Sequence, residues 1–372
     1  MKTERSFGIG DYHMTDKKPV LFYAVKRLSG GILTFLTDLS NRLIETYDIS
    51  IAFYPDSETP QQIRTLFDPR VKMYSVTSFE SDGNPLTDGG GGTELKALCE
   101  EIHPDIVHLH GFGAGRIGRK IFANAGIPVF YTPHGYLFLA EDHNRITKSM
   151  YRRIEKNLAK TNCVTIACSR SEYAEALAFS DTAVYVNNGI NTESIDQLLQ
   201  ETAIPEHPLT VYTSGLINPQ KNPALFNEIA MAMPDVQFVW IGDGEMRYKL
   251  TAPNTKITGW LPREEALKQA ASADVFILTS LWEGLPLTLL EAMYMNKLCV
   301  VSNVAGSKDL IVNGETGFVC NSAAAFVNAI HQFRENNVSD LITNAREEVL
   351  ENYTIEKMVQ GYDAIYRKAL GR

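Results

Sequence analysis

Two glutamates with seven residues between them, Glu283 and Glu291, flank a loop that opens onto a predicted helix. An apolar run lies on each side of this segment, which is the pattern of a βαβ unit. The backbone N–H groups of Gly284, Leu285 and Leu287 lie where the helix begins, and a helix N-terminus is a favourable site for phosphate. Because carboxylates accept hydrogen bonds from hydroxyl groups, the stretch predicts a site for a phosphate-bearing, hydroxyl-rich ligand.

Other candidate residues stand where predicted strands end. His134 follows a buried strand, and side chains at the carboxyl end of a parallel strand face the crevice in which such sheets bind ligands. His110 ends the preceding strand and is a candidate for the side of that crevice that holds a second substrate. Gly30 and Gly31 follow the first predicted strand, where backbone N–H groups can face an anion. A structural histidine and a plain tight turn are the alternatives for His134 and for the glycine pair.

A glycine pattern between residues 111 and 118 permits two interpretations. Gly113-x-Gly115-x-x-Gly118 matches the dinucleotide-binding fingerprint and lies between a strand and a helix. That fingerprint requires an acid at the end of the next strand to hold the ribose, but this chain has Pro133 and His134 there. Close packing of a helix on a strand therefore explains the glycines better than NAD binding.

Length and composition indicate a two-domain globular protein. The chain has 372 residues, of which 44% are hydrophobic and 21% charged, and this length exceeds a single simple core. A formal net charge of −9 argues against a general nucleic-acid binder. The five cysteines show no C-x-x-C spacing, and neither a signal peptide nor a membrane-spanning run is evident. These features predict reduced cysteines, a cytoplasmic protein and no metal site.

Strand and helix patterns alternate along the chain and divide it into two halves. We expect a loose N-terminal tail over residues 1–18 and a first α/β domain over 19–200. A linker over 201–208 contains Pro205 and Pro208, and a second α/β domain follows over 209–354. The glycine-rich stretch 81–92 is expected to be a flexible connection.

The second half resembles a known enzyme family. The phrase from Glu283 to Met293 and the segment Thr213–Asn222 resemble retaining glycosyltransferases of the GT-B fold, family 4, also called glycosyl transferases group 1. In that family the first glutamate of the pair holds the donor sugar and the second holds the ribose. The resemblance is tight from about residue 209 to 320 and looser over the first half.

The resemblance implies roles for further residues. Lys221 would meet the diphosphate of the donor, with Gly215 in the same loop, and Trp260 and Leu261 would lie beside the nucleobase. Gly30 and Gly31 would face the diphosphate from the other domain, and His134 would lie against the donor sugar near its anomeric carbon. The catalytic set implied is therefore His134, Glu283 and Lys221. One departure stands out, because Leu216 replaces the family's arginine.

Fold and activity follow from the same resemblance. It implies two Rossmann-like, doubly wound domains that face each other across a cleft, with a C-terminal helix, 355–372, crossing back onto the first domain. The implied reaction transfers a hexosyl group, with retention and without a metal or other cofactor, from a nucleotide-diphosphate sugar to a glycan or lipid-linked oligosaccharide. We expect a UDP-sugar rather than a GDP-sugar, and a role in bacterial surface polysaccharide biosynthesis. A GT-B epimerase or hydrolase and a non-catalytic binding protein are the alternatives.

A predicted helix over residues 145–160 carries an unusual concentration of positive charge. Its apolar residues recur every fourth position and are expected to be buried: Ile146, Met150, Ile154 and Leu158. The cations form a separate stripe that includes Arg145, Lys148, Arg152 and Lys156. Such a stripe suits peripheral contact with an anionic membrane, on the inner face of the cytoplasmic membrane, that would bring the enzyme to a lipid-linked acceptor. A solvated charged face is the alternative.

Overall fold

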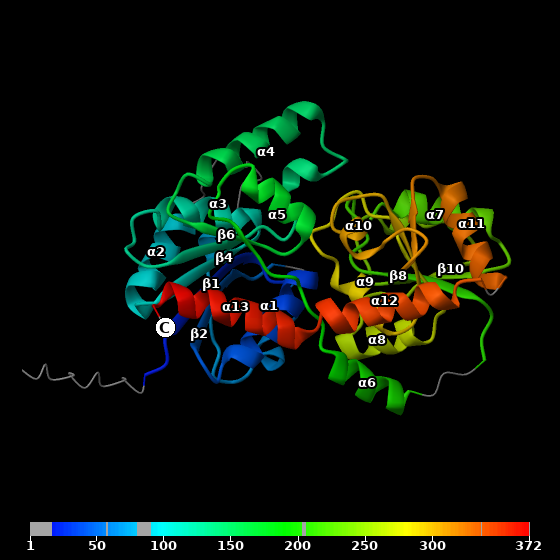
Figure 1. Ribbon diagram of the computed structural model, residues 1–372, viewed down its shortest axis with the longest axis horizontal. Coiled ribbons are helices and arrows are strands. Elements are labelled where there is room, and N and C mark those ends of the chain that lie inside the picture. The colour runs from blue at the N-terminus through cyan, green and yellow to red at the C-terminus, as the bar shows by residue number, and fades with distance from the viewer. Residues whose placement is uncertain (1–16, 57–58, 80–90, 203–205, 336, 372) are drawn as a thin grey trace, which may run out of the picture.

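The computed structural model describes residues 17–56, 59–79, 91–202, 206–335 and 337–371. It contains two parallel β-sheets that lie side by side, each covered by helices on both faces (Figure 1). Most of the expected N-terminal tail and most of the expected glycine-rich connection fall outside the described residues. Strands buried on both faces require continuous apolar runs, which explains why such runs in the sequence predicted them.

The first sheet has the strand order β3-β2-β1-β4-β5-β6-β7, and the second has the order β10-β9-β8-β11-β12-β13. The first contains β1 (Val20–Arg27), β2 (Asp48–Tyr54), β3 (Lys72–Ser75), β4 (Ile106–His110), β5 (Val129–Thr132), β6 (Val164–Ala167) and β7 (Val184–Tyr185). The second contains β8 (Thr210–Ser214), β9 (Gln237–Ile241), β10 (Thr255–Ile257), β11 (Val275–Leu278), β12 (Leu298–Ser302) and β13 (Phe318–Cys320).

Most of the helices follow strands of the two sheets, and the last three helices come after the last strand. In the first half they are α1 (Gly30–Leu43), α2 (Gly91–Ile102), α3 (Gly111–Ile121), α4 (Arg145–Leu158), α5 (Arg170–Leu177) and α6 (Thr192–Glu201). In the second half they are α7 (Pro223–Ala232), α8 (Arg263–Ala271), α9 (Leu287–Tyr294), α10 (Ser307–Leu310), α11 (Ala323–Arg334), α12 (Ser339–Asn352) and α13 (Ile355–Ala369). Short 3-10 helices are η1 (Ile63–Leu66), η2 (Thr77–Phe79), η3 (Leu137–Leu139) and η4 (Arg247–Lys249).

The last helix joins the two halves. Helix α12 packs against α9 of the second half, and α13 continues along the front of the molecule onto α1 of the first (Figure 1). Tyr47 donates a hydrogen bond to Asp363 over 2.8 Å, and Tyr366 lies 2.7 Å from a ring nitrogen of His108. The C-terminal helix therefore completes the core of the first half and reaches β4, the strand that ends in His110.

The glycines of α3 are explained by packing. A Cβ on Gly115 would lie 2.2 Å from the ring of Tyr131, and one on Gly118 would lie 2.4 Å from the side chain of Leu109. Both distances are impossible for real atoms, so only glycine lets α3 lie this close to β4 and β5. The packing interpretation of the Gly113-x-Gly115-x-x-Gly118 pattern is confirmed.

Helix α4 buries or half-buries three of its four expected apolar residues, and Ile146 is the exception. Ile146, expected to be buried, is 83% exposed, whereas Glu155 is buried and 2% exposed. The cause is a buried ion pair, in which Arg119 of α3 lies 2.9 Å from Glu155 while Tyr131 donates a second hydrogen bond to the same carboxylate over 3.2 Å. The expectation for Ile146 was wrong because this polar anchor decides which face turns inward.

The carboxyl ends of the two sheets face each other. After β5, Gly135 approaches the loop after β11 so closely that a Cβ on Gly284 would lie 2.8 Å from the carbonyl carbon of His134. Asn188 donates to the carbonyl of Leu285 over 3.0 Å. Ligands of open parallel sheets bind beyond the carboxyl ends of the strands, so the candidate site lies where these two edges meet.

Candidate active site

An ion pair at the end of β11 forms the centre of the site. The Lys221 ammonium lies 2.7 Å from Glu283 Oε1, and the two side chains are only 15% and 7% exposed. Ser280 donates a second hydrogen bond to the same oxygen over 2.6 Å. Charges removed from water in this way are strongly coupled, so Lys221 and Glu283 act as one unit.

Two loops are hydrogen-bonded to each other and hold this pair in place. Leu281 donates its N–H to the carbonyl of Gln220, and the Gln220 amide donates back to the carbonyl of Trp282 over 3.0 Å. Thr279 donates to the carbonyl of Lys221 over 2.7 Å. The segment before α7 and the segment before α9 are therefore tied together on both sides of the Lys221–Glu283 pair.

Gly215 leaves space for the lysine to reach the glutamate. It has a φ of +136°, which disfavours any side chain, and a Cβ there would lie 3.2 Å from Lys221 Cε. The lysine stem crosses directly over this glycine. Leu216 follows Gly215 and is half-buried. Its side chain is apolar, so this position offers no charge where the family has an arginine.

The second glutamate pairs with an arginine from a neighbouring helix. Glu291, 6% exposed, lies with Oε1 2.7 Å from Arg263 at the start of α8. Arg263 also donates to Thr34 of α1 over 3.4 Å, across the junction between the halves. One turn along α1, burial raises the pKa of Asp38 from 3.8 to about 6, although Arg263 opposes the rise. Arg263 therefore lies between carboxylates of both halves.

His134 occupies an unusual backbone conformation that a buried carboxylate fixes. Its φ is +55° and that of Gly135 is +105°, so two consecutive residues lie in the left-handed region. Glu172 of α5 accepts the N–H of Gly135 over 2.7 Å and the N–H of Cys168 over 2.8 Å. This carboxylate turns the chain after β5 so that the histidine stands at the meeting point of the sheets.

His134 is the outer member of a row of three histidines. Its Nε2 lies 3.0 Å from Nδ1 of His110, and the two rings stack at 5.3 Å between centroids. His108 continues the row inward, 4.1 Å from His110 between ring centroids. Burial lowers the pKa of His134 to about 3 and those of His108 and His110 well below their usual value. All three rings are therefore neutral at physiological pH.

Two family models match consecutive parts of this chain. Residues 29–194 match the family model Glycosyltransferase Family 4, and residues 194–352 match Glycosyl transferases group 1. The chain is 30% identical over 333 residues to UDP-Gal:alpha-D-GlcNAc-diphosphoundecaprenol alpha-1,3-galactosyltransferase of Escherichia coli, covering 80% of this chain and 84% of that one. The chain belongs to glycosyltransferase family 4.

Solved structures show the same fold at low identity. The family 4 chain superimposes on a sucrose-phosphate synthase from Thermosynechococcus elongatus with a TM-score of 0.80 at 17% identity, covering 95% of this chain and all of that one. It superimposes on Anabaena Alr3699/HepE, solved with UDP and glucose, with a TM-score of 0.74 at 17% identity, covering 93% and 98%. The two Rossmann-like domains are those of the GT-B fold.

The other predicted donor-site residues of this glycosyltransferase differ in their exposure to solvent. Gly30 and Gly31 are exposed, and Cβ atoms on them would meet nothing within 4 Å. Trp260 is 62% exposed and immediately precedes Leu261, which is half-buried. Leu285 and Leu287 are buried, so only their backbones could face a ligand.

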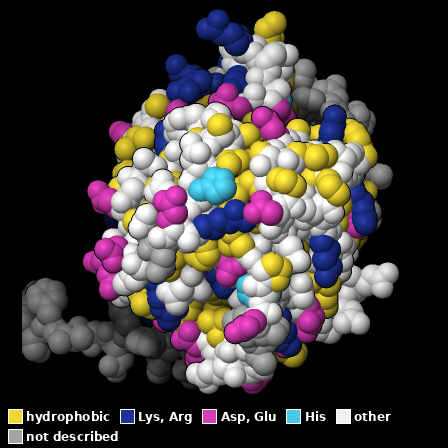
Figure 2. Space-filling view, turned by 90° about the vertical axis from the view of Figure 1, so that its right-hand side faces the viewer, with side chains coloured by type: hydrophobic (Ala, Val, Ile, Leu, Met, Phe, Trp, Pro, Cys, Tyr) yellow, Lys and Arg dark blue, Asp and Glu magenta, His cyan; other side chains and the backbone are white. Residues whose placement is uncertain are grey.

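The residues predicted for the acceptor or membrane side divide into two groups. His110 is 1% exposed, so the prediction that it lines the acceptor side directly is corrected, because it reaches the junction only through His134. On α4, Lys148 lies 3.1 Å from Glu141, and Arg152 lies 3.0 Å from Glu175. Arg145 and Lys156 are exposed, and Lys and Arg side chains gather at the top of Figure 2, where α4 lies in Figure 1.

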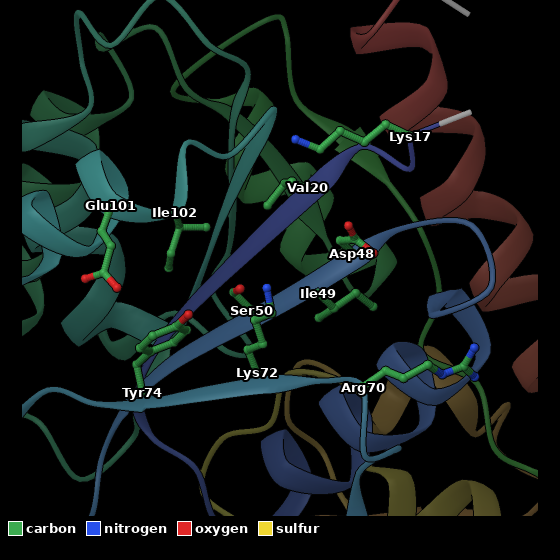
Figure 3. A pocket seen from close by; sticks show the side chains of 10 residues that line it. All are labelled: Lys17, Val20, Asp48, Ile49, Ser50, Arg70, Lys72, Tyr74, Glu101 and Ile102. Atoms are coloured by element: carbon green, nitrogen blue, oxygen red, sulfur yellow. The ribbon is translucent and has the colours of Figure 1, made fainter. Parts of the chain in front are cut away.

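A separate cavity of about 350 Å³ lies elsewhere in the family 4 enzyme. Its lining includes Val20, Asp48 and Lys72, the first residues of β1, β2 and β3, together with Lys17 and Arg70 (Figure 3). These are the amino ends of the strands, away from the edge where such sheets bind ligands. We therefore do not assign this cavity to the donor.

Three site residues were not anticipated from the sequence, namely Arg263, Asp38 and Glu172. One signal was available for Glu172, because Ser169-x-x-Glu172 has the sequence spacing of a capping box. Ser169 does cap the helix by accepting the N–H of Glu172, but the carboxylate accepts the N–H groups of Cys168 and Gly135 instead of that of Ser169. Nothing in the sequence links Arg263 to a partner 229 positions away. Within the described part of the chain, no cluster of His, Cys, Asp or Glu could hold a metal ion, and no helix there is long and apolar enough to cross a bilayer.

Proposed function

We propose that this family 4 glycosyltransferase transfers a hexosyl group from a UDP-sugar to a hydroxyl of a lipid-linked glycan, with retention at the anomeric carbon. The Lys221–Glu283 pair carries the proposal, because it places a cation for the diphosphate directly beside a carboxylate for the sugar hydroxyls. The full-length relative, named as a galactosyltransferase acting on a diphosphoundecaprenol acceptor, supports both the donor and the lipid-linked acceptor.

In the proposed reaction Glu283 and Glu291 accept hydrogen bonds from sugar and ribose hydroxyls. Lys221 and the start of α9 stabilise the charge that develops on the departing diphosphate. His134 contacts the sugar ring where oxocarbenium character develops, and its neutral imidazole adds no positive charge there. The acceptor hydroxyl attacks from the leaving-group side, and its proton passes to a phosphate oxygen.

The direct test combines donor binding with turnover. The purified chain is titrated with UDP, GDP, ADP and NAD in a thermal-shift assay, because a ligand at a hundred times its dissociation constant adds about 2.7 kcal/mol of stability. We expect a shift with UDP that Glu291→Ala reduces. Incubation with UDP-galactose or UDP-glucose and a GlcNAc-diphospholipid should then yield an α-linked product by NMR.

Each other result of this test supports a different conclusion. A β-linked product would contradict retention. Donor loss without an acceptor would indicate a hydrolase or epimerase, and binding without turnover would indicate a non-catalytic protein. Unchanged turnover in His134→Ala would remove the proposed role of His134.

We also propose that α4 brings the enzyme to an anionic membrane. Exposed cations on this helix lie beside Ile146, whose 83% exposed side chain can insert among lipid headgroups. Each basic residue near an anionic leaflet contributes about 1 kcal/mol. Arg145→Gln with Lys156→Gln should therefore weaken binding to phosphatidylglycerol vesicles roughly 30-fold, since two such losses total about 2 kcal/mol.

A matched control removes the same charge elsewhere. Lys249 and Lys256 are exposed residues of the second domain, and changing both to glutamine should leave vesicle binding within about threefold, because they lie off the proposed surface. Equal losses in the two double variants would show a net-charge effect only. No vesicle binding by the unchanged protein would remove the proposal.

A further inference from the structure

The three histidines at the junction are not equivalent, and the middle one determines what the outer one can offer. His134 Nε2 is already engaged with His110 Nδ1 at 3.0 Å. His134 is the only partly exposed member of the row, whereas His108 and His110 are 0% and 1% exposed. The nitrogen that remains for a ligand at the junction is therefore His134 Nδ1.

Only two proton arrangements are open to a pair of neutral imidazoles joined in this way. In the first, His110 Nδ1–H donates to His134 Nε2, and His134 then carries its proton on Nδ1. In the second, His134 Nε2–H donates to His110 Nδ1, and His134 Nδ1 is a bare lone pair. The two arrangements present opposite hydrogen-bonding groups to a sugar.

The surroundings of His110 distinguish the two arrangements. Its Nε2 is buried and has no hydrogen-bond partner, and the rings of Tyr23 and Phe35 pack against it with centroids 5.2 and 5.7 Å away. The second arrangement would leave an N–H at this nitrogen, and an aromatic face receives an N–H only weakly. The first arrangement leaves a lone pair there, and unfilled acceptors are tolerated inside proteins somewhat better than orphaned N–H groups.

We propose that His110 is a positioning residue that holds His134 as the Nδ1–H tautomer, so that His134 donates a hydrogen bond to an oxygen of the donor sugar. Two contacts orient the His134 ring, namely the hydrogen bond with His110 and the edge-on packing of Phe35, whose ring centroid lies 4.9 Å away. This inference rests on the proposed contact between His134 and the sugar. It goes beyond that contact by assigning the group that makes it and the residue that sets it.

His108 provides a matched control for this role. It lies on the same strand, two residues from His110, and is equally buried. Its two nitrogens contact Tyr366 and Thr132, at 2.7 and 2.9 Å, and neither contacts His134. Deleting either imidazole removes a similar buried volume, but only the change at His110 leaves His134 without its partner.

The kinetic test compares a leucine variant of His110, which removes the imidazole, with an asparagine variant, which keeps an N–H donor. His110→Leu should lower kcat by about a hundredfold, as expected when a histidine loses its fixed tautomer, with a smaller change in the KM for UDP-sugar. His110→Asn should restore most of kcat, because its amide N–H can replace Nδ1–H. His108→Leu should keep kcat within about threefold despite a similar loss of melting temperature. Equal kcat losses in the two leucine variants, or no rescue by asparagine, would overturn the proposal.

The spectroscopic test does not depend on turnover. In the 15N-histidine-labelled full chain, the His134 signals are identified by their absence in His134→Gln, and long-range 15N–1H correlations report which ring nitrogen is protonated. We expect Nδ1–H for His134 in the unchanged protein and a mixture in His110→Leu. Nε2–H in the unchanged protein would overturn the inference. Unchanged turnover in His134→Ala alongside an Nδ1–H tautomer would instead remove the sugar contact proposed above.

Discussion

Lys221 and Glu283 show how the site uses a charge pair before any substrate arrives. Each charge is largely removed from water, and each offsets the desolvation of the other. A diphosphate would compete for the lysine, and sugar hydroxyls would replace part of the carboxylate's hydrogen bonding. Binding therefore exchanges one set of charge-assisted contacts for another.

The coupling of this pair can be measured by a double-mutant cycle. Lys221→Met should destabilise the fold by about 3–5 kcal/mol, because it leaves a buried carboxylate uncompensated. Adding Glu283→Gln to that variant should recover part of the loss of stability, although we expect neither single variant to turn over. Denaturant unfolding of the four proteins gives the interaction energy. Additive losses would show that the two side chains are independent.

Helices α1 and α8 meet across the junction through Arg263, and this contact should respond to pH. Burial raises the pKa of Asp38 on α1 from 3.8 to about 6. The nearby charge of Glu291 also raises this pKa, whereas Arg263 and Arg42 lower it. Its native-state pKa exceeds its unfolded value, so the native state binds more protons between those two values. The contribution of Asp38 to stability is therefore present below pH 3.8 and is lost as the pH rises through 6.

Asp38→Asn should remove this dependence. The stability of the variant relative to the unchanged protein should rise between pH 4 and pH 6.5, as measured by urea unfolding at several pH values. Asp340→Asn, at an exposed position in α12, is the control and should leave the curve unchanged. A parallel curve for Asp38→Asn would show that Asp38 titrates as it does in the unfolded chain.

Elements were predicted well where one residue pattern determines them. The buried strands follow from apolar runs, and the loop before α9 follows from Gly284 and Pro286 beside paired acids. The burial of α4 could not be predicted in the same way, because Arg119 turns Glu155 inward from 36 positions away. Arg263 was missed for the same reason, since its partners lie on other elements. Local periodicity determines which segment is a helix, but long-range polar pairs determine which face is buried.

At the scale of the whole molecule, one hydrophobic cluster runs through both domains, and polar and backbone contacts join them further where the carboxyl edges of the two sheets meet. Ser171 of the first domain donates its N–H and its hydroxyl to Asp309 of the second, over 3.0 and 2.7 Å. The Asn188 amide donates a hydrogen bond to the carbonyl of Leu285 in the second domain. The backbones of Gly135 and Gly284 are in contact at this junction. Gly306 lies on the other side of Gly284, and a Cβ on Gly306 would be 2.4 Å from the carbonyl oxygen of Gly284. These backbone contacts place His134 beside the loop after β11.

Weakening the contacts between the domains without changing the loop after β11 should therefore affect turnover more than UDP binding. Ser171→Ala with Asn188→Ala removes two side-chain hydrogen bonds between the domains, each worth about 1 kcal/mol. Together they weaken the contact between the domains by about 2 kcal/mol, which corresponds to a factor of roughly 30. We expect kcat to fall while the Kd for UDP, measured by calorimetry, stays within about threefold, because most of the nucleotide contacts that we propose lie in the second domain. A loss of UDP affinity as large as the loss of kcat would show that the first domain contributes equally to nucleotide binding, and unchanged kcat would show that these contacts do not govern turnover.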